Sequence, residues 1–200
     1  MFIVYPILLA VPIGLLLGGS FARLGSIEIR WAWLAVAGLA VQVVLFSDAV
    51  ASTVGAAGPP LYVGSTIAVF VVVLRNLRVR GFALVALGAG LNLAAILANG
   101  GCMPASPEAL AAVGELHGLD PGVYTNSCLP ERVALAPLTD ILHLPPELPL
   151  ANVFSFGDAV IGAGVAAAVV LGMRSGGRAA GGTSRPPTAP DTSDSEHSRA

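Results

Sequence analysis

The sequence contains one long polar, proline-rich stretch, which opens with Asn99-Gly100-Gly101-Cys102-Met103-Pro104 and closes with Asn152-Val153-Phe154-Ser155-Phe156-Gly157-Asp158. Strongly apolar runs lie before and after it. Both cysteines and two of the three histidines fall inside it. We therefore expect a set of apolar helices interrupted by one structured segment, residues 99–152, called the outer segment below.

The composition indicates an integral membrane protein. Of 200 residues, 55% are hydrophobic and only 11% are charged, whereas soluble domains carry roughly a quarter charged residues. The net charge of -2 gives no reason to expect nucleic acid as a partner. The partner that the composition does predict is the lipid bilayer.

Five apolar runs approach the roughly 20 residues that a helix needs to cross a hydrocarbon core of about 30 Å. An open strand in lipid would leave its backbone groups unpaired, so the β-branched third run is also predicted to be helical. No cleavable signal pattern is visible at the start, so we expect the first run to be retained. The sequence thus predicts an all-α membrane protein with five transmembrane helices, at residues 2–19, 31–47, 60–75, 82–98 and 153–173.

Arginine placement predicts the orientation, because cytoplasmic connections are enriched in basic residues. Arginines follow the first, third and fifth runs, whereas the turn after the second run has none and the outer segment has only Arg132. This alternation places the N-terminus outside, the C-terminus inside and the outer segment on the extracytoplasmic face of the inner membrane. Residues 174–200 contain too few apolar side chains to fold and are predicted to be a disordered cytoplasmic tail. The arginines that decide this are Arg23, Arg30, Arg75, Arg78, Arg80, Arg174 and Arg178.

Small residues recur every four positions in the fourth and fifth runs. Such spacing lets two helix backbones approach closely in a membrane. We expect the fourth and fifth helices to pack together along these stripes, which are Ala86, Gly90, Ala94 and Ala98 in one helix and Ala159, Ala163 and Ala167 in the other.

A short helix is predicted in the outer segment. Ser106 can cap it, and Pro107 and Glu108 suit its first turn. Its apolar residues Leu110, Val113 and Leu116 share one face, and Gly118 can end it. That face would lie either on the membrane surface or against the mouth of the bundle.

Titratable side chains of the outer segment give no metal-binding pattern. His117 and His143 lack ligand spacing, so we expect solvated loop histidines, no metal and no cofactor. Cys102 and Cys128 lie on the oxidising side if the orientation holds, which favours a disulfide. Closing this loop would contribute about 3 kcal/mol. Free thiols and a redox-active pair are the alternatives, although the usual C-x-x-C is absent.

Polar residues inside the runs fall in one layer. Gln42, Asn92 and Asp158 each lie six or seven residues inside the outer end of their run, or roughly 9–10 Å deep at 1.5 Å per residue. Ser155 and Asp158 also fit a capping box at the start of the fifth helix. Because ionisable groups are costly in a bilayer, an outward-opening pocket of Gln42, Asn92 and Asp158 is the functional alternative to the simple cap.

Three motifs resemble one family. Asn-Gly-Gly-x-Met-Pro at 99–104, Thr-Asp-Ile with Leu-Pro at 139–145, and Asn-Val-Phe-Ser-x-Gly-Asp at 152–158 look like the bacterial multi-pass membrane family catalogued as domain of unknown function 5317. The resemblance covers most of residues 1–173 in layout and implies the fold, but no activity or cofactor. Members often carry a basic residue at Cys102, which makes a disulfide an accessory feature. The motif residues are Asn99, Gly100, Gly101, Met103, Pro104, Asp140, Asn152, Ser155, Gly157 and Asp158.

Three functions compete on these grounds. No nucleophile–base pair or metal set is visible, which favours a non-enzymatic protein that binds a ligand or a partner subunit, or a second copy, through its extracytoplasmic face. The alternative is a small transporter or channel subunit that uses the polar layer. A thiol-redox or lipid-modifying membrane enzyme is the further alternative.

Overall fold

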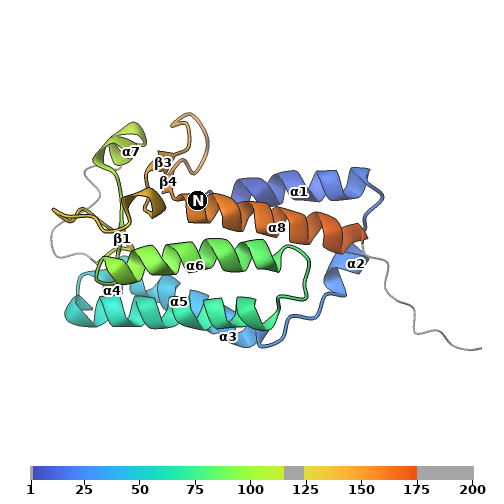
Figure 1. Ribbon diagram of the computed structural model, residues 1–200, viewed down its shortest axis with the longest axis horizontal. Coiled ribbons are helices and arrows are strands. Elements are labelled where there is room, and N and C mark those ends of the chain that lie inside the picture. The colour runs from blue at the N-terminus through green and yellow to red at the C-terminus, as the bar shows by residue number, and fades with distance from the viewer. Residues whose placement is uncertain (1, 115–123, 175–200) are drawn as a thin grey trace, which may run out of the picture.

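The computed structural model describes residues 2–114 and 124–174, and it is mostly helical (Figure 1). In chain order the elements are α1 (Val4–Leu16), α2 (Phe21–Gly25), α3 (Ala32–Leu45), α4 (Asp48–Ala51), the 3-10 turn η1 (Gly55–Ala57), α5 (Gly58–Arg75), α6 (Phe82–Ala98), β1 (Met103–Pro104), α7 (Pro107–Ala112), β2 (Ser127–Cys128), η2 (Ala136–Leu138), β3 (Leu142–His143), β4 (Val153–Phe154) and α8 (Phe156–Arg174).

Five long helices, α1, α3, α5, α6 and α8, lie side by side (Figure 1). Each overlaps one of the five predicted runs, although α5 begins two residues earlier and α8 ends one residue later than predicted. Helix α8 packs between α1 and α6, and α5 packs between α6 and α3. The short elements of the outer segment gather at one end, where α6 ends and α8 begins. Helix α2 lies at the opposite end, beside the end of α8.

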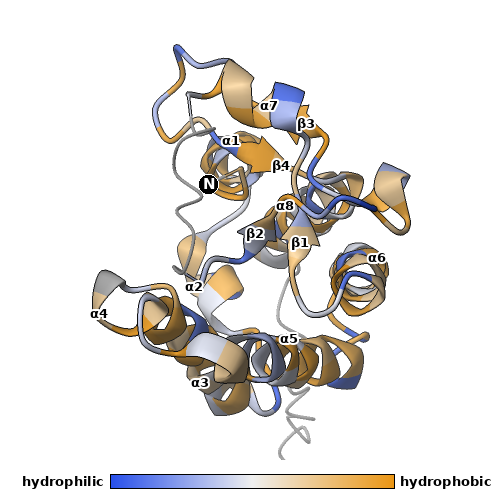
Figure 2. Ribbon diagram, turned by 90° about the vertical axis from the view of Figure 1, so that its left-hand side faces the viewer, coloured by the Kyte–Doolittle hydropathy of each residue, from blue (hydrophilic) through white to orange (hydrophobic). Residues whose placement is uncertain are grey.

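Two of these helical stretches, Gly55–Arg75 and Phe156–Arg174, are long and apolar enough to cross a membrane. Helices α1, α3 and α6 are apolar but shorter. Large apolar side chains are exposed on the bundle, including Leu16, Val43 and Trp33, which are 87%, 74% and 70% exposed. Hydrophobic residues predominate along the long helices (Figure 2).

The predicted packing of the fourth helix on the fifth is confirmed, because α6 and α8 are in extensive contact. The two helices approach closely at Gly88, where an added Cβ would lie 2.4 Å from Gly157 O. At Gly164, an added Cβ would lie 2.7 Å from the backbone nitrogen of Val85. The predicted stripe is wrong at Gly90, which faces Phe70 of α5. The close approaches at Gly88, Gly157 and Gly164 lie one or two positions away from the predicted stripes.

The outer segment, together with Val153 and Phe154 just before α8, forms two small two-stranded sheets. Strand β1 pairs in parallel with β2, and β3 pairs antiparallel with β4. Residues from α3, α5, α6 and β1 form the larger buried apolar cluster, so the core lies under the outer segment. Its members are Leu45, Tyr62, Ala95, Ile96 and Met103.

The helix predicted from Ser106 is confirmed at its start and is shorter at its end. Ser106 Oγ accepts the backbone N–H of Ala109 at 3.3 Å, but α7 ends at Ala112. Leu110 is buried against Ala105 and Val153, which matches the alternative of packing within the protein rather than on a membrane surface. Residues Leu116, His117 and Gly118, and the tail from 175 onward, lie outside the described residues.

Candidate functional site

Asn92, Ser155 and Asp158 form one hydrogen-bonded network between α6 and the start of α8. Asn92 Nδ2 donates to Asp158 Oδ1 at 2.8 Å. Ser155 Oγ lies 2.8 Å from Asn92 Oδ1 and 3.0 Å from Asp158 Oδ2. A hydroxyl has one hydrogen, so Ser155 donates to one of these oxygens at a time. The network ties the two helices together at the end that carries the outer segment.

The capping box predicted at Ser155 and Asp158 is present. Ser155 Oγ accepts the backbone N–H of Asp158 at 3.0 Å, and Asp158 Oδ2 accepts the backbone N–H of Ser155 at 3.0 Å. Both caps satisfy backbone donors that the first turn of a helix leaves open. Asp158 therefore serves the local cap and the contact to Asn92 together.

Gly157 makes the approach of Asn92 possible. A Cβ at this position would lie 1.8 Å from Asn92 Oδ1, so any side chain at Gly157 would displace the amide. The Ser-x-Gly-Asp part of the motif thus encodes three linked features: a cap, a gap for Asn92 and an acceptor for its N–H group.

Asp140 lies beside this network, on the outer segment. Asp140 forms an isolated parallel bridge with Ala105, and two residues later the chain enters β3, which pairs with β4 just ahead of α8. The backbone of Asp140 bonds to the Met-Pro motif strand, because its N–H donates to Pro104 O at 3.0 Å and its C=O accepts from Ser106 N at 2.9 Å. The outer segment thereby holds this carboxyl at the mouth of the bundle.

The Asp140 side chain is 6% exposed, and its Oδ1 has no hydrogen-bond partner among the described residues. Burial, and secondly the negative charge of Asp158, raise the pKa of the Asp140 carboxyl to about 7. A buried carboxylate without a partner is costly, so the neutral acid is favoured up to that pH. The Asp140 carboxyl can therefore gain and lose a proton near neutrality.

Gln42 lies in a different hydrogen-bonded contact from the one predicted for it. Its Nε2 donates to Ser65 Oγ at 3.2 Å and to Thr66 Oγ1 at 3.3 Å, which joins α3 to α5. Of the three residues proposed for a polar pocket, the structure thus brings Asn92 and Asp158 into contact. No hydrogen bond between Gln42 and either of them is found in the described part of the chain.

The remaining motif residues shape the outer segment. Asn99 Nδ2 donates to Ala134 O at 2.9 Å, and its Oδ1 accepts from Ala134 N at 2.9 Å, so one side chain clamps a loop 35 residues away. Gly100 and Gly101 have φ of +73° and +93°, a region that favours glycine. They turn the chain so that Met103 enters the core and Pro104 continues strand β1.

Asn152 is the last motif residue. Its Nδ2 donates to Val153 O at 2.7 Å, and its Oδ1 is buried with no partner among the described residues. Its backbone C=O accepts from Leu144 N at 3.1 Å, which closes the β3–β4 hairpin. The register puts Asn152 at the far end of this hairpin from Asp140, so the two unpartnered oxygens belong to separate places.

The predicted disulfide joins Cys102 to Cys128, with 6.0 Å between their Cα atoms. It lies beside the β1–β2 pair, where Ala105 N donates to Cys128 O at 3.0 Å. Both cysteines are thereby joined in a structural disulfide and are not free thiols.

No cluster of three metal-ligating side chains occurs in residues 2–114 and 124–174. His143 is exposed, and its Nδ1 lies 3.2 Å from Leu144 O. Ser155 is fully buried, so its hydroxyl cannot reach a substrate in this conformation. The Asn92–Ser155–Asp158 network is a set of hydrogen bonds that joins α6 to the start of α8.

Sequence reasoning missed two features. It marked Asp140 only as a motif residue, although a lone acid between threonine and isoleucine is a signal for burial. It used Arg78 and Arg80 only for orientation, whereas both line a cavity at the opposite end of the bundle.

A family model for a family of unknown function, DUF5317, matches residues 26–170 of this chain. No curated protein and no solved structure matches the chain. The matched range includes the Asn92–Ser155–Asp158 network, Asp140, the disulfide, helices α3, α5 and α6, and most of α8. Since the match spans well over half of the 200 residues, the chain belongs to the DUF5317 family.

Proposed function

We propose that this protein is a five-span membrane protein that acts without catalysis, by binding a protein partner through its extracytoplasmic outer segment. Its spans are α1, α3, α5, α6 and α8, with the N-terminus outside. The exposed apolar faces of the bundle support membrane insertion, and the arginine distribution supports the orientation.

The outer segment suits binding because it is fixed to the bundle at several points. Phe154 stacks on Phe2 with 4.1 Å between ring centroids, and Pro149 O accepts a hydrogen bond from Tyr5. The Asn99 clamp and the disulfide fix the rest. A surface held in this way loses little conformational entropy when it binds.

Two leucines of this segment carry the proposal. Leu135 and Leu150 have φ of +53° and +58°, a backbone region that is strained for branched side chains. Their side chains are 47% and 62% exposed, so both present apolar surface to their surroundings. Strained backbone is found preferentially at functional sites, and an apolar surface on a partner protein would cover these two side chains.

Site-specific photo-crosslinking tests this proposal. A photoreactive residue at Leu135 or Leu150, in intact membranes, should give a discrete protein adduct, whereas one at the exposed polar Asn126 should not. The adduct from position 135 should disappear in Leu150→Ser, and a crosslinker placed in the identified partner should form the same adduct with this chain. Adducts with lipid alone at both leucines would contradict partner binding.

Labelling with a membrane-impermeant maleimide tests the orientation separately. Intact cells should label at Cys102 and Cys128 only after reduction. Labelling that occurs only after cell lysis would show that the orientation is reversed and that the outer segment faces the cytoplasm.

A transporter or channel subunit is the second candidate, and the Asp140–Asp158 pair favours it. A protonatable carboxyl beside a second carboxylate is a common part of proton-coupled sites. Against it, the spans carry almost no polar side chains at the opposite end to continue a path. Proton or solute flux in reconstituted vesicles that is lost in Asp140→Asn would favour transport over partner binding.

A further inference from the structure

We infer that the cavity at the opposite end of the bundle binds the phosphate group of an anionic phospholipid. This cavity, of about 240 Å³, is lined by Ile27, Arg78, Val79, Arg80, Ala168 and Gly172. At about 30 Å³ for each water in the liquid, it has room for a phosphate and several adjoining heavy atoms.

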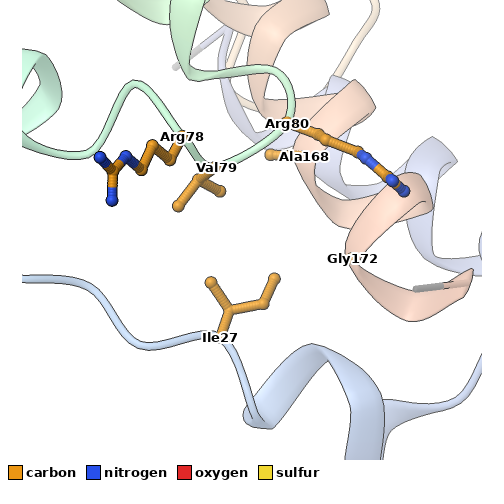
Figure 3. Close-up of a pocket in the computed structure, with 6 residues that line it drawn as sticks. All are labelled: Ile27, Arg78, Val79, Arg80, Ala168 and Gly172. Carbon is orange, nitrogen blue, oxygen red and sulfur yellow. The ribbon is translucent and has the colours of Figure 1, made fainter. Parts of the chain in front are cut away.

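Three separate parts of the chain build the walls (Figure 3). Ile27 comes from the segment after α2, the arginines come from the turn between α5 and α6, and Ala168 and Gly172 come from the last turns of α8. Figure 3 shows the side chains of Arg78 and Arg80 leaving the turn on either side of Val79. Basic groups thus border a floor that is otherwise apolar.

The walls are held in place without a ligand. Asn76 is 4% exposed and clamps the segment before α3, because its Oδ1 accepts from Arg30 N and its Nδ2 donates to Arg30 O, both at 2.8 Å. Gly81 holds the turn against α8, since a Cβ there would lie 2.7 Å from Ala168 N. The two rims therefore cannot separate freely, and the cavity is preorganised for binding.

The charge of this end favours an anion. The segments that surround the cavity, residues 20–31 and 75–81 with residue 174, contain six arginines and a single acidic residue, Glu28. Among residues 2–114 and 124–174, no acidic side chain lines the cavity itself. A guanidinium binds phosphate through two parallel hydrogen bonds, and the apolar floor suits the glycerol and upper acyl carbons of a lipid.

A lipid is favoured over free phosphate because the cavity lies where apolar helix surface gives way to arginines. Exposed Trp31 and Trp33 lie at the same end, with Arg75 placed 5.1 Å above the ring of Trp31. Aromatic and basic side chains together are typical of a membrane interface. The leaflet follows from the orientation proposed above, whereas binding itself does not depend on it.

Lipid retention by the full-length protein in detergent, measured by native mass spectrometry, tests this site. Phosphatidylglycerol should be retained over phosphatidylcholine with the same acyl chains. Arg78→Gln should weaken that retention about tenfold, since it removes a hydrogen bond to a charged group. Ala168→Leu should weaken it to a similar degree by filling the cavity while leaving both arginines. Arg132→Gln, which removes one arginine from the outer segment, is the matched control and should bind normally.

Competition with inorganic phosphate separates the two sources of the ligand. Displacement of phosphatidylglycerol at millimolar phosphate would show that the phosphate group alone is recognised, and resistance would show that the acyl and glycerol contacts contribute. Equal retention by Arg78→Gln and Arg132→Gln, or no preference over phosphatidylcholine, would overturn the assignment. These readouts use no outer-segment partner, so they can fail independently of the proposed function.

Discussion

Asn92 Nδ2 donates a hydrogen bond to Asp158 Oδ1 at 2.8 Å, which is a polar contact between α6 and α8 where the helices also approach at glycines. Replacing Asn92 by alanine would leave Ser155, among the described residues, as the one side chain that donates to Asp158. We expect Asn92→Ala to lower the free energy of unfolding by about 1–2 kcal/mol. Unfolding in detergent by titration with sodium dodecyl sulfate measures this.

Asn126→Ala is the control for the same substitution. The Asn126 side chain is exposed, so its truncation should change the unfolding free energy by less than about 0.5 kcal/mol. Equal midpoints for the two variants would show that the Asn92–Asp158 contact contributes nothing to the α6–α8 interface.

The disulfide should stabilise the outer segment rather than the helices. Its loop spans a separation of 26 residues, for which the chain-entropy model gives about 3 kcal/mol. Changing Cys102 and Cys128 together to serine should lower the thermal midpoint and make residues 103–114 more susceptible to proteolysis. A thermal midpoint that is the same with and without reductant in the wild-type protein would count against this role.

The positions of the long helices could be predicted closely from the sequence, because apolar runs and the helix-breaking residues that end them are local sequence features. Helix α6 matches the predicted 82–98, since Gly81 precedes it and Asn99 ends it. Helix α1 ends at Leu16, before the predicted 19, because Gly18 turns the chain at φ +77° and Gly19 packs on Met173. Crossing of a membrane by all five helices stays a prediction.

The start of α8 and the small sheets could not be predicted in the same way. The predicted span begins at 153, whereas Val153 and Phe154 form β4 and the helix begins at Phe156. Strand pairing joins residues distant in sequence, such as Met103 with Ser127, and no local pattern records it. The capping box at Ser155 was the usable signal for the true start.

The polar layer was predicted from the depth of each residue in its helix, and depth does not determine which face of the helix the residue occupies. Gln42, Asn92 and Asp158 can lie at similar heights on different helix faces. Which face each one uses depends on helix rotation and on neighbour order, and these were not available from the sequence. Gln42 bonds to Ser65 and Thr66 because α3 has α5 as its neighbour, while α8 lies beyond α6.

Gly88 should tolerate no side chain. Its added Cβ would meet the backbone atoms Gly157 O at 2.4 Å and Ile161 N at 2.8 Å, and backbone atoms cannot rotate away. Gly88→Ala should therefore force α6 from α8 and cost about 1–3 kcal/mol of unfolding free energy. Gly64→Ala, in α5 with nothing within 4 Å of the added Cβ, should be neutral or slightly stabilising. If Gly64→Ala is as destabilising as Gly88→Ala in the same detergent titration, helix packing is not the cause.

Asp140 should make stability depend on pH. Its pKa is raised from 3.8 to about 7 in the folded protein, first by burial and then by Asp158. The folded state thus binds more protons than the unfolded state between these values, so the free energy of unfolding falls as pH rises from about 4 to about 7. At about 1.4 kcal/mol for each pKa unit, the loss is a few kcal/mol.

Asp140→Asn keeps the shape of the side chain and cannot ionise, so its unfolding free energy should lack the pH dependence that Asp140 contributes. The difference between the two proteins, measured from pH 4 to 8, isolates Asp140 from the other carboxyls. A difference that stays constant over this range would mean that Asp140 is ionised in the folded protein throughout and that a donor, not a proton, satisfies its buried oxygen.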